Sequence, residues 1–249
     1  MTARFFVDDI IGNAGEVRLS REECHHLSRV LRLQVGDAVA VFDKAGRAFE
    51  AIVQAINSHE ALLRIEKALP ARGLTLALTV AISPIRPEAM SWLVQKLTEL
   101  GVSALAPFVS SRTSLPQAGD AESDESRRKR WERISLAACK QCGRTTPIAI
   151  QPVRPFSKVF AELPSPCFFA WEGGDALPLA KAAQSANQNQ FHSASIVIGP
   201  EGGFTAEEMQ LALNHGVVVV DLGPNILRAE TAAIAASAII LAVLGTPIS

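Results

Sequence analysis

Two glycine-containing loops follow apolar segments near the end of the chain, and their residue types could bind a ligand. The first loop is Ile198–Gly203, with the sequence IGPEGG, and it follows a predicted strand over 195–198. The second is Leu222–Thr231, LGPNILRAET, which leads into the last predicted helix. Glycine lets backbone N–H and C=O groups approach a ligand, and ligands of open α/β sheets bind at the carboxyl ends of strands. The pair therefore predicts a site where backbone groups could read an adenine edge, with two tight turns as the alternative.

Other chemical motifs are weak or missing. No G-x-G-x-x-G follows a strand and no P-loop pattern occurs, so neither dinucleotide nor P-loop chemistry has its usual signature. Cys139 and Cys142 form a single C-x-x-C pair inside a predicted helix, which favours a structural role over zinc binding. His25 and His26 are adjacent on a helix and point in different directions, so we expect His25 to be exposed and His26 to be partly packed. No metal site is expected.

Basic residues are concentrated in the middle of the chain. Residues 126–144 hold seven Lys or Arg and one Glu, a sum of +6, in a protein whose net charge is −1. Such a cluster is typical of a surface that binds phosphate backbones, although a solvated helix face is the commoner explanation of a charge run. Arg4, Arg29 and Arg32 could extend the cluster.

The elements that must position these residues fall into two parts. Residues 1–72 contain short strand-like runs and one helix, and they predict a small β-barrel-like domain. That helix is expected to begin with a capping box between Ser20 and Glu23 and to run to about Leu33. Pro70–Gly73 is the predicted linker.

From Gly73 onward, apolar strands alternate with helical patterns, which predicts an α/β domain with a mainly parallel sheet. Helices are expected over 87–100, 127–142 and 229–244, and Thr205 and Glu208 form a second capping box. Loops are expected over 116–126 and 182–195.

The composition argues against a disordered, secreted or membrane-spanning protein. The chain of 249 residues is 48% hydrophobic and 20% charged, so it can form a core and is not intrinsically disordered. Its N-terminus lacks the pattern of a secretory signal, and the apolar run over 231–244 is too short to span a bilayer. We expect a soluble cytoplasmic protein without a membrane partner.

Five segments together resemble the ribosomal RNA small subunit methyltransferase E family of the SPOUT superfamily. Besides IGPEGG and LGPNILRAETA, they are QKLTELGV at 95–102, WERISLAACKQCGR at 131–144 and HHLSRVLRLQVGD at 25–37. Members of this family make N3-methyluridine in 16S rRNA. The motifs occur in order over residues 25–236, so the resemblance covers nearly the whole chain.

The resemblance implies a fold and partners that pattern analysis could not supply. It implies a PUA-like RNA-binding domain over 1–72 and a SPOUT methyltransferase domain over 73–249, with a C-terminal trefoil knot. The cofactor would be S-adenosylmethionine, the substrate would be 16S rRNA in the small ribosomal subunit, and the protein would be a homodimer.

The resemblance also assigns residues by position. The expected cofactor-binding residues are Ile198, Gly199, Pro200, Glu201, Gly202, Gly203, Leu222, Gly223, Ile226, Leu227, Arg228 and Thr231. Together with Arg4, Arg29 and Arg32 from the basic cluster, the expected RNA-binding residues are Lys96, Arg112, Gln141 and Arg144. One departure is that Ser111 stands where the family often has Glu, so a role for that carboxylate is not expected here.

The reaction itself suggests two catalytic residues. Uridine N3 carries a proton that must leave, so the site needs a proton acceptor or a cation that stabilises the uridine anion. Arg228 is the expected anion-stabilising group. Glu230 could be the base, or it could order Arg228 or interact with the positive end of the last helix, and the residues leave both roles open.

Overall fold

The computed structural model describes residues 2–8, 10, 15–57, 59–70, 73–113, 121–174, 176–187 and 191–246. The chain forms two compact units. The N-terminal unit comprises residues 1–72 and 136–147, and the α/β unit comprises 73–135 and 148–248. Of the predicted linker, Ala71 and Arg72 lie outside the described residues.

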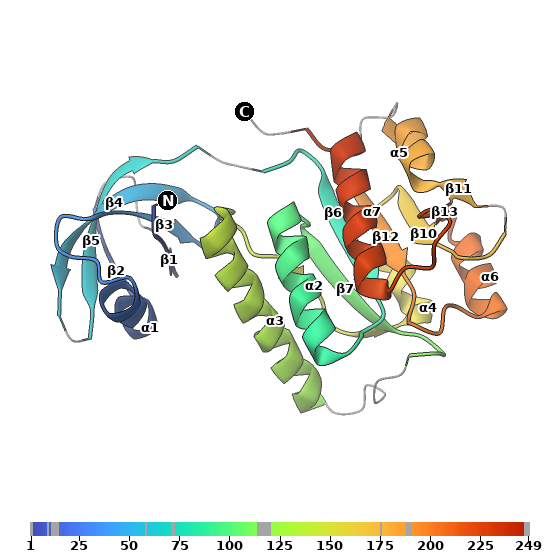
Figure 1. The fold of residues 1–249 in the computed structure, drawn as a ribbon, viewed down its shortest axis with the longest axis horizontal. Helices are drawn as coiled ribbons and strands as arrows, with labels where there is room; N and C mark the ends of the chain where they lie inside the picture. The colour runs from blue at the N-terminus through green and yellow to red at the C-terminus, as the bar shows by residue number, and fades with distance from the viewer. Residues whose placement is uncertain are drawn as a thin grey trace. The chain divides into compact units, whose positions relative to one another are not determined.

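The N-terminal unit is a curved five-stranded sheet around an apolar core (Figure 1). The order is β1-β3-β4-β5-β2, and every pairing is antiparallel except the parallel pair β1 and β3. Phe5, Leu27 and Leu63 lie fully buried in its core. The strands are β1 (Arg4–Val7), β2 (Glu16–Arg18), β3 (Ala38–Asp43), β4 (Ala48–Ile56) and β5 (Ala61–Ala68).

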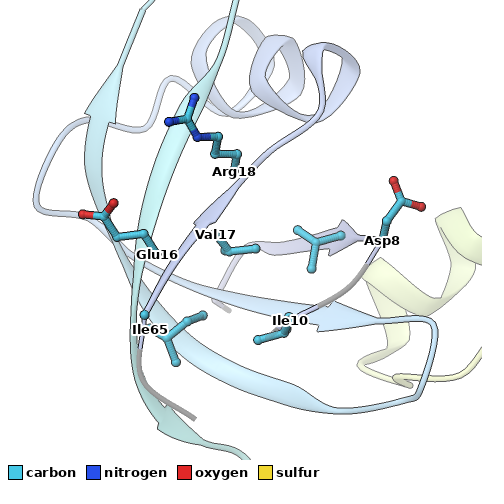
Figure 2. Close-up of a pocket in the computed structure, with 8 residues that line it drawn as sticks. Asp8, Ile10, Glu16, Val17, Arg18 and Ile65 are labelled. Carbon is cyan, nitrogen blue, oxygen red and sulfur yellow. The ribbon is translucent and has the colours of Figure 1, made fainter. Parts of the chain in front are cut away.

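A cavity of about 260 Å³ is lined by residues at the end of β1, in β2 and in β5. Figure 2 shows side chains that line it. Two of its three charged side chains have partners, since Arg18 pairs with Glu60 and Asp8 pairs with Lys44, and the third, Glu16, is exposed on β2. The apolar part of the lining includes Ile10 and Ile65. Nothing in this arrangement resembles a catalytic site.

The helix of the N-terminal unit is shorter than predicted. α1 (Arg21–His25) continues as a π-helical turn, η1 (His26–Val30), and ends there because Arg32 adopts a left-handed backbone with a φ of 56°. The first capping box is half formed: the Ser20 hydroxyl accepts from the Glu23 N–H, but the Glu23 carboxylate pairs with Lys140 instead.

The α/β unit contains one long sheet in the order β11-β13-β10-β12-β6-β7-β8, and its pairings are parallel. Its strands are β6 (Ala77–Ile82), β7 (Ala104–Val109), β8 (Ala149–Ile150), β9 (Arg154–Pro155, paired with β7), β10 (Cys167–Ala170), β11 (Leu177–Pro178), β12 (Ser193–Ile198) and β13 (Val218–Asp221). Its helices are α2 (Pro87–Leu100), α3 (Ala121–Cys142, grouped with this unit up to residue 135), α4 (Phe156–Val159), η2 (Phe160–Glu162), α5 (Leu179–Asn187), α6 (Ala206–Asn214) and α7 (Ala229–Leu244). The expected α/β fold with a parallel sheet is confirmed.

Helices cover both faces of this sheet. Alternate strand residues point to opposite faces, so Ile196 packs in the core beneath α2, α5 and α7, while Val197 packs in the core with α4 and α6. α2 and α7 lie side by side in Figure 1. A sheet buried on both faces explains why its strands are almost continuously apolar.

Two of the predicted loops are wrong in part. Residues 121–126 are the first turns of α3, where the side chains of Asp124 and Glu125 pair with Arg127 and Arg128 one turn later. Residues 182–187 complete α5, and 193–195 begin β12. Residues 114–120 and 188–190 lie outside the described part.

Helix ends with clear capping signals are confirmed. α2 runs from Pro87 to Leu100, and Gly101 terminates it with a φ of 96° that favours glycine. Thr205 and Glu208 form both hydrogen bonds of the second capping box. α7 spans 229–244 as predicted.

Candidate functional site

A cavity of about 1050 Å³ opens at the carboxyl ends of the central strands of the α/β unit. The last residues of three strands line it: Ala170 of β10, Ile198 of β12 and Asp221 of β13. The loops that follow these strands form most of the remaining wall. The volume reaches the upper end of the range usual for small-molecule sites, roughly 300–1,000 Å³.

The two predicted glycine loops line this cavity, but their strands are not neighbours. β10 lies between β12 and β13, so a third loop, Trp171–Gly174, stands between the other two. This loop has the sequence WEGG, and a side chain at Gly173 would come within 2.9 Å of the Trp171 indole nitrogen. Glycine at 173 therefore leaves room for the indole at the cavity wall.

The first glycine loop rests on an aromatic cluster. A Cβ at Gly199 would lie 2.8 Å from the ring of Phe204, which packs against Phe169 and Phe156 with ring centroids 4.5 and 5.2 Å apart. Phe204 is buried and has little freedom to move aside. The loop can follow this path only with glycine at 199.

Two residues fasten the loop after β7 to the loop after β12. The Arg112 guanidinium donates to the carbonyl oxygens of Gly202, at 2.9 Å, and Phe204, at 3.4 Å. The buried Glu208 carboxylate accepts from the Ser111 N–H at 2.7 Å and from the Thr205 N–H at 2.9 Å. The segment in which this chain departs from the family pattern is thus held by a carboxylate of α6.

The charges of the cavity are distributed unequally. Glu172, Glu201 and Asp221 belong to the loops or ends of β10, β12 and β13. Arg86 and Arg112 follow β6 and β7, on the other side of β12, and Arg228 precedes α7. The carboxylates suit a cationic group, and the arginines suit anionic oxygens.

Most of the expected cofactor-binding residues line this cavity: Ile198, Gly199, Pro200, Glu201, Gly202, Gly203, Leu222, Gly223, Ile226, Leu227 and Arg228. Thr231 does not line it and is exposed on α7. Glu230 also lies outside the lining, in the first turn of α7 beyond the N-cap Arg228. The structure therefore brings Arg228, but not Glu230, to the cavity.

Sequence inspection missed the WEGG loop and Arg86. Two glycines after the apolar run 167–171 were an available signal for the loop, of the same kind as IGPEGG. No local sequence pattern could have identified Arg86, because its place at the cavity depends on β6 pairing with β12, which is more than a hundred residues away.

The expected RNA-binding residues divide between the two units. In the N-terminal unit, the Arg4 guanidinium lies against Gly143, where a Cβ would be 2.8 Å from it, so Arg4 is near the QCGR segment that contains Gln141 and Arg144. Burial lowers the pKa of the Arg144 guanidinium. Arg29 and Arg32 are exposed on and just after η1.

In the α/β unit, Lys96 is bound by a carboxylate of its own helix. Its Nζ donates to both oxygens of Glu99 at 2.9 Å, whereas Arg112 lines the cavity. An RNA contact by Lys96 would therefore have to compete with Glu99.

The basic cluster is less positive than the sequence suggested. Over 121–142, α3 holds six basic and four acidic residues, a sum of +2, because it begins earlier than predicted. Arg127 pairs with Asp124, Arg128 with Glu125 and Glu132, and Lys129 with Glu125. These pairs offset part of the positive charge in the first half of α3.

The cysteines and histidines show no metal site among the described residues. Cys139 is buried, which raises the pKa of its thiol to about 12, and Cys142 is exposed. His25 is exposed and His26 packs edge-on against Phe5, as expected. Across the described part of the chain, no helix has both the length and the apolar character needed to cross a membrane.

Comparison with known proteins places these features in a family. The family model of the RNA methyltransferase domain matches residues 72–241, and that of the RNA methyltransferase PUA domain matches residues 19–66. Ribosomal RNA small subunit methyltransferase E of Bacillus subtilis is 28% identical over 239 residues, 92% of either chain. Its namesake in Synechocystis is 31% identical over 230 residues, 92% of this chain and 73% of that protein.

A solved structure agrees with the fold over almost the whole chain. Ribosomal RNA small subunit methyltransferase E from Neisseria gonorrhoeae, bound to S-adenosyl methionine, has a TM-score of 0.88 and 28% identity, covering 98% of this chain and 99% of that one. The matches span the PUA-like part, the α/β part and the cavity loops between residues 170 and 232. The chain belongs to the ribosomal RNA small subunit methyltransferase E family of RNA methyltransferases.

Proposed function

We propose that this protein transfers a methyl group from S-adenosylmethionine to N3 of a uridine in 16S rRNA within the assembled small subunit. One observation carries the proposal: the cavity that three strand-end loops form lies in the region matched by the RNA methyltransferase model, and IGPEGG forms part of its wall. The N3 position rests on the family resemblance.

The cavity suits S-adenosylmethionine chemically. Glycine-rich loops after β10, β12 and β13 would present backbone groups to the adenine, Leu222 and Leu227 offer apolar contact, and Glu172 and Asp221 supply negative charge. When bound, the cofactor supplies a methyl group on a cationic sulfonium. A Cβ at Gly199 would displace the Phe204 ring and change the wall on which the cofactor would rest.

Arg228 is the residue that we assign to the reacting base. It is exposed, lines the cavity and precedes the first turn of α7, so its guanidinium can donate to O2 or O4 of a uridine whose N3 proton passes to solvent water. Because Glu230 lies outside the cavity lining, we assign it to the helix start and to the orientation of Arg228 rather than to proton transfer. N3 lies on the Watson–Crick edge, so the target uridine must be unpaired when it enters.

We further propose a cytoplasmic homodimer with a knotted C-terminal domain over 73–249 and an RNA-binding domain over 1–72. This assembly rests on the resemblance to the family.

The test is transfer of a labelled methyl group to small subunits that lack the modification, with naked 16S rRNA in parallel and mass spectrometry of the nucleosides. We expect N3-methyluridine in the subunits and little in naked RNA. A folded, cofactor-binding protein that methylates neither substrate would contradict the proposal.

Replacing Arg228 separates catalysis from cofactor binding. Arg228→Ala should lower kcat about 100-fold or more, the usual loss when one oxyanion donor is removed, while the Kd for S-adenosylmethionine stays within about threefold. Calorimetry and single-turnover kinetics measure the two quantities. An equal loss of both would place Arg228 in the cofactor site instead.

A further inference from the structure

The cavity is larger and more cationic on one side than a cofactor site alone requires. Its volume of about 1050 Å³ leaves room for a second group beside a bound cofactor. The glycine loops belong to β10, β12 and β13, whereas β6 and β7 contribute two arginines, Arg86 and Arg112. The β6–β7 side therefore differs from the rest of the cavity in charge.

Arg86 is the arginine on that side without a partner. Its side chain is exposed and forms no hydrogen bond or ion pair with another described residue, whereas Arg112 donates to the Gly202 and Phe204 carbonyl oxygens. Arg86 is also the N-cap of α2, so the positive end of that helix dipole lies at the same rim. An unpaired guanidinium beside a helix N-terminus favours an anionic ligand.

We infer that Arg86 binds a backbone phosphate of the target nucleotide and holds the uridine at the β6–β7 side of the cavity. The inference rests on the proposed function. A guanidinium binds phosphate oxygens through two parallel N–H···O bonds, which fixes orientation as well as position. Arg112, fastened to the loop after β12, lies on the same side and couples this phosphate site to the cofactor loop.

The variants Arg86→Ala, Arg86→Lys and Lys158→Ala test the assignment. Lys158 is an exposed lysine of α4 outside the cavity, so its replacement removes one positive charge without touching the site. We measure the KM for small subunits, the Kd for S-adenosylmethionine, and the affinity for subunits at several salt concentrations.

Arg86→Ala should raise the KM for subunits about tenfold or more, the usual loss for a hydrogen bond to a charged group. A plot of log affinity against log salt concentration has a negative slope. Its magnitude should decrease by about 0.7, as expected when one phosphate contact on a single strand is lost. The Kd for cofactor should stay within about twofold. Arg86→Lys should keep the salt slope but not the full affinity, and Lys158→Ala should behave like the wild type.

Two results would overturn the inference. A loss of cofactor affinity equal to the loss of RNA affinity would assign Arg86 to the cofactor, and wild-type values throughout would exclude a role in binding. The salt slope does not depend on turnover. A wild type that binds subunits without methylating them would therefore contradict the proposed function while the comparison of variants still decides the role of Arg86.

Discussion

Gly199 illustrates how the packing of one side chain decides which residue can form a ligand site. The Phe204 ring folds back beneath the loop and is fixed by Phe108, Phe156 and Phe169. Its position leaves no space for a methyl group at 199.

Gly199→Ala should therefore weaken cofactor binding at least tenfold and lower the free energy of unfolding by about 1–3 kcal/mol, because the methyl group forces the cluster to shift. Calorimetry and urea denaturation measure the two effects. Gly15→Ala is the control, since a Cβ there meets nothing within 4 Å. Normal binding by Gly199→Ala would show that the aromatic cluster can yield.

The cysteines should differ in reactivity. Cys142 is exposed, whereas Cys24, Cys139 and Cys167 are buried and the pKa of Cys139 is about 12. Because the thiolate is the reactive form, an alkylating agent at pH 8 should modify Cys142 in the folded protein and all four cysteines after denaturation. Mass spectrometry of the peptides identifies the sites. Rapid labelling of Cys139 in the folded state would indicate that the end of α3 opens.

At the scale of elements, α6 does more than cover the sheet. Its first turn carries Glu208, which caps the helix and also accepts from the Ser111 backbone, 97 positions earlier. One carboxylate thus joins the start of α6 to the loop after β7.

Glu208→Gln should lower the free energy of unfolding by about 1–2 kcal/mol and raise the KM for RNA. A glutamine oxygen can satisfy one of the two backbone N–H groups, while its amide faces the other. Glu207→Gln changes the exposed neighbouring residue, whose pKa is lowered by hydrogen bonds at the start of α6, and should cost less than Glu208→Gln in thermal denaturation and kinetics. Equal effects of the two variants would assign the loss to charge rather than to the link.

The ends of α2 and the start of α6 were among the most predictable parts of the fold. Pro87 and Gly101 mark α2, and Thr205 and Glu208 mark the start of α6, because these signals act over one turn. The start of α3 was harder to predict, because the polar segment 121–125 has the composition of a loop. In the helix, Asp124 and Glu125 pair with Arg127 and Arg128.

The candidate site was predictable where it depends on local sequence. Glycine after an apolar strand located both predicted loops. The WEGG loop stands between the other two loops because β10 pairs with β12 and β13, and Arg86 reaches the cavity because β6 pairs with β12. No local pattern contains these pairings between distant segments.

At the scale of the whole molecule, α3 belongs to both compact units. Residues up to 135 group with the α/β unit, and residues 136–147 group with the N-terminal unit. Lys140 pairs there with Glu23, whose side chain is 8% exposed, so the pairing ties the end of α3 to α1.

Lys140→Ala should lower the free energy of unfolding by about 2 kcal/mol, because it leaves a buried carboxylate without its cation. Adding Glu23→Gln should recover part of that loss. Lys129→Ala removes an exposed pair on the same helix and should cost less than about 0.5 kcal/mol. Urea denaturation compares the variants, and equal losses for Lys140→Ala and Lys129→Ala would contradict a stabilising role for the buried pair.

The WEGG loop also gives the protein an internal optical reporter. The chain has three tryptophans and no tyrosine, and of these Trp171 lines the cavity, while Trp131 is buried and Trp92 lies outside the lining. A ligand that fills the cavity changes the surroundings of one indole and leaves the other two as a constant background. Intrinsic fluorescence can therefore follow occupancy without a label, and Trp171→Phe should abolish the signal.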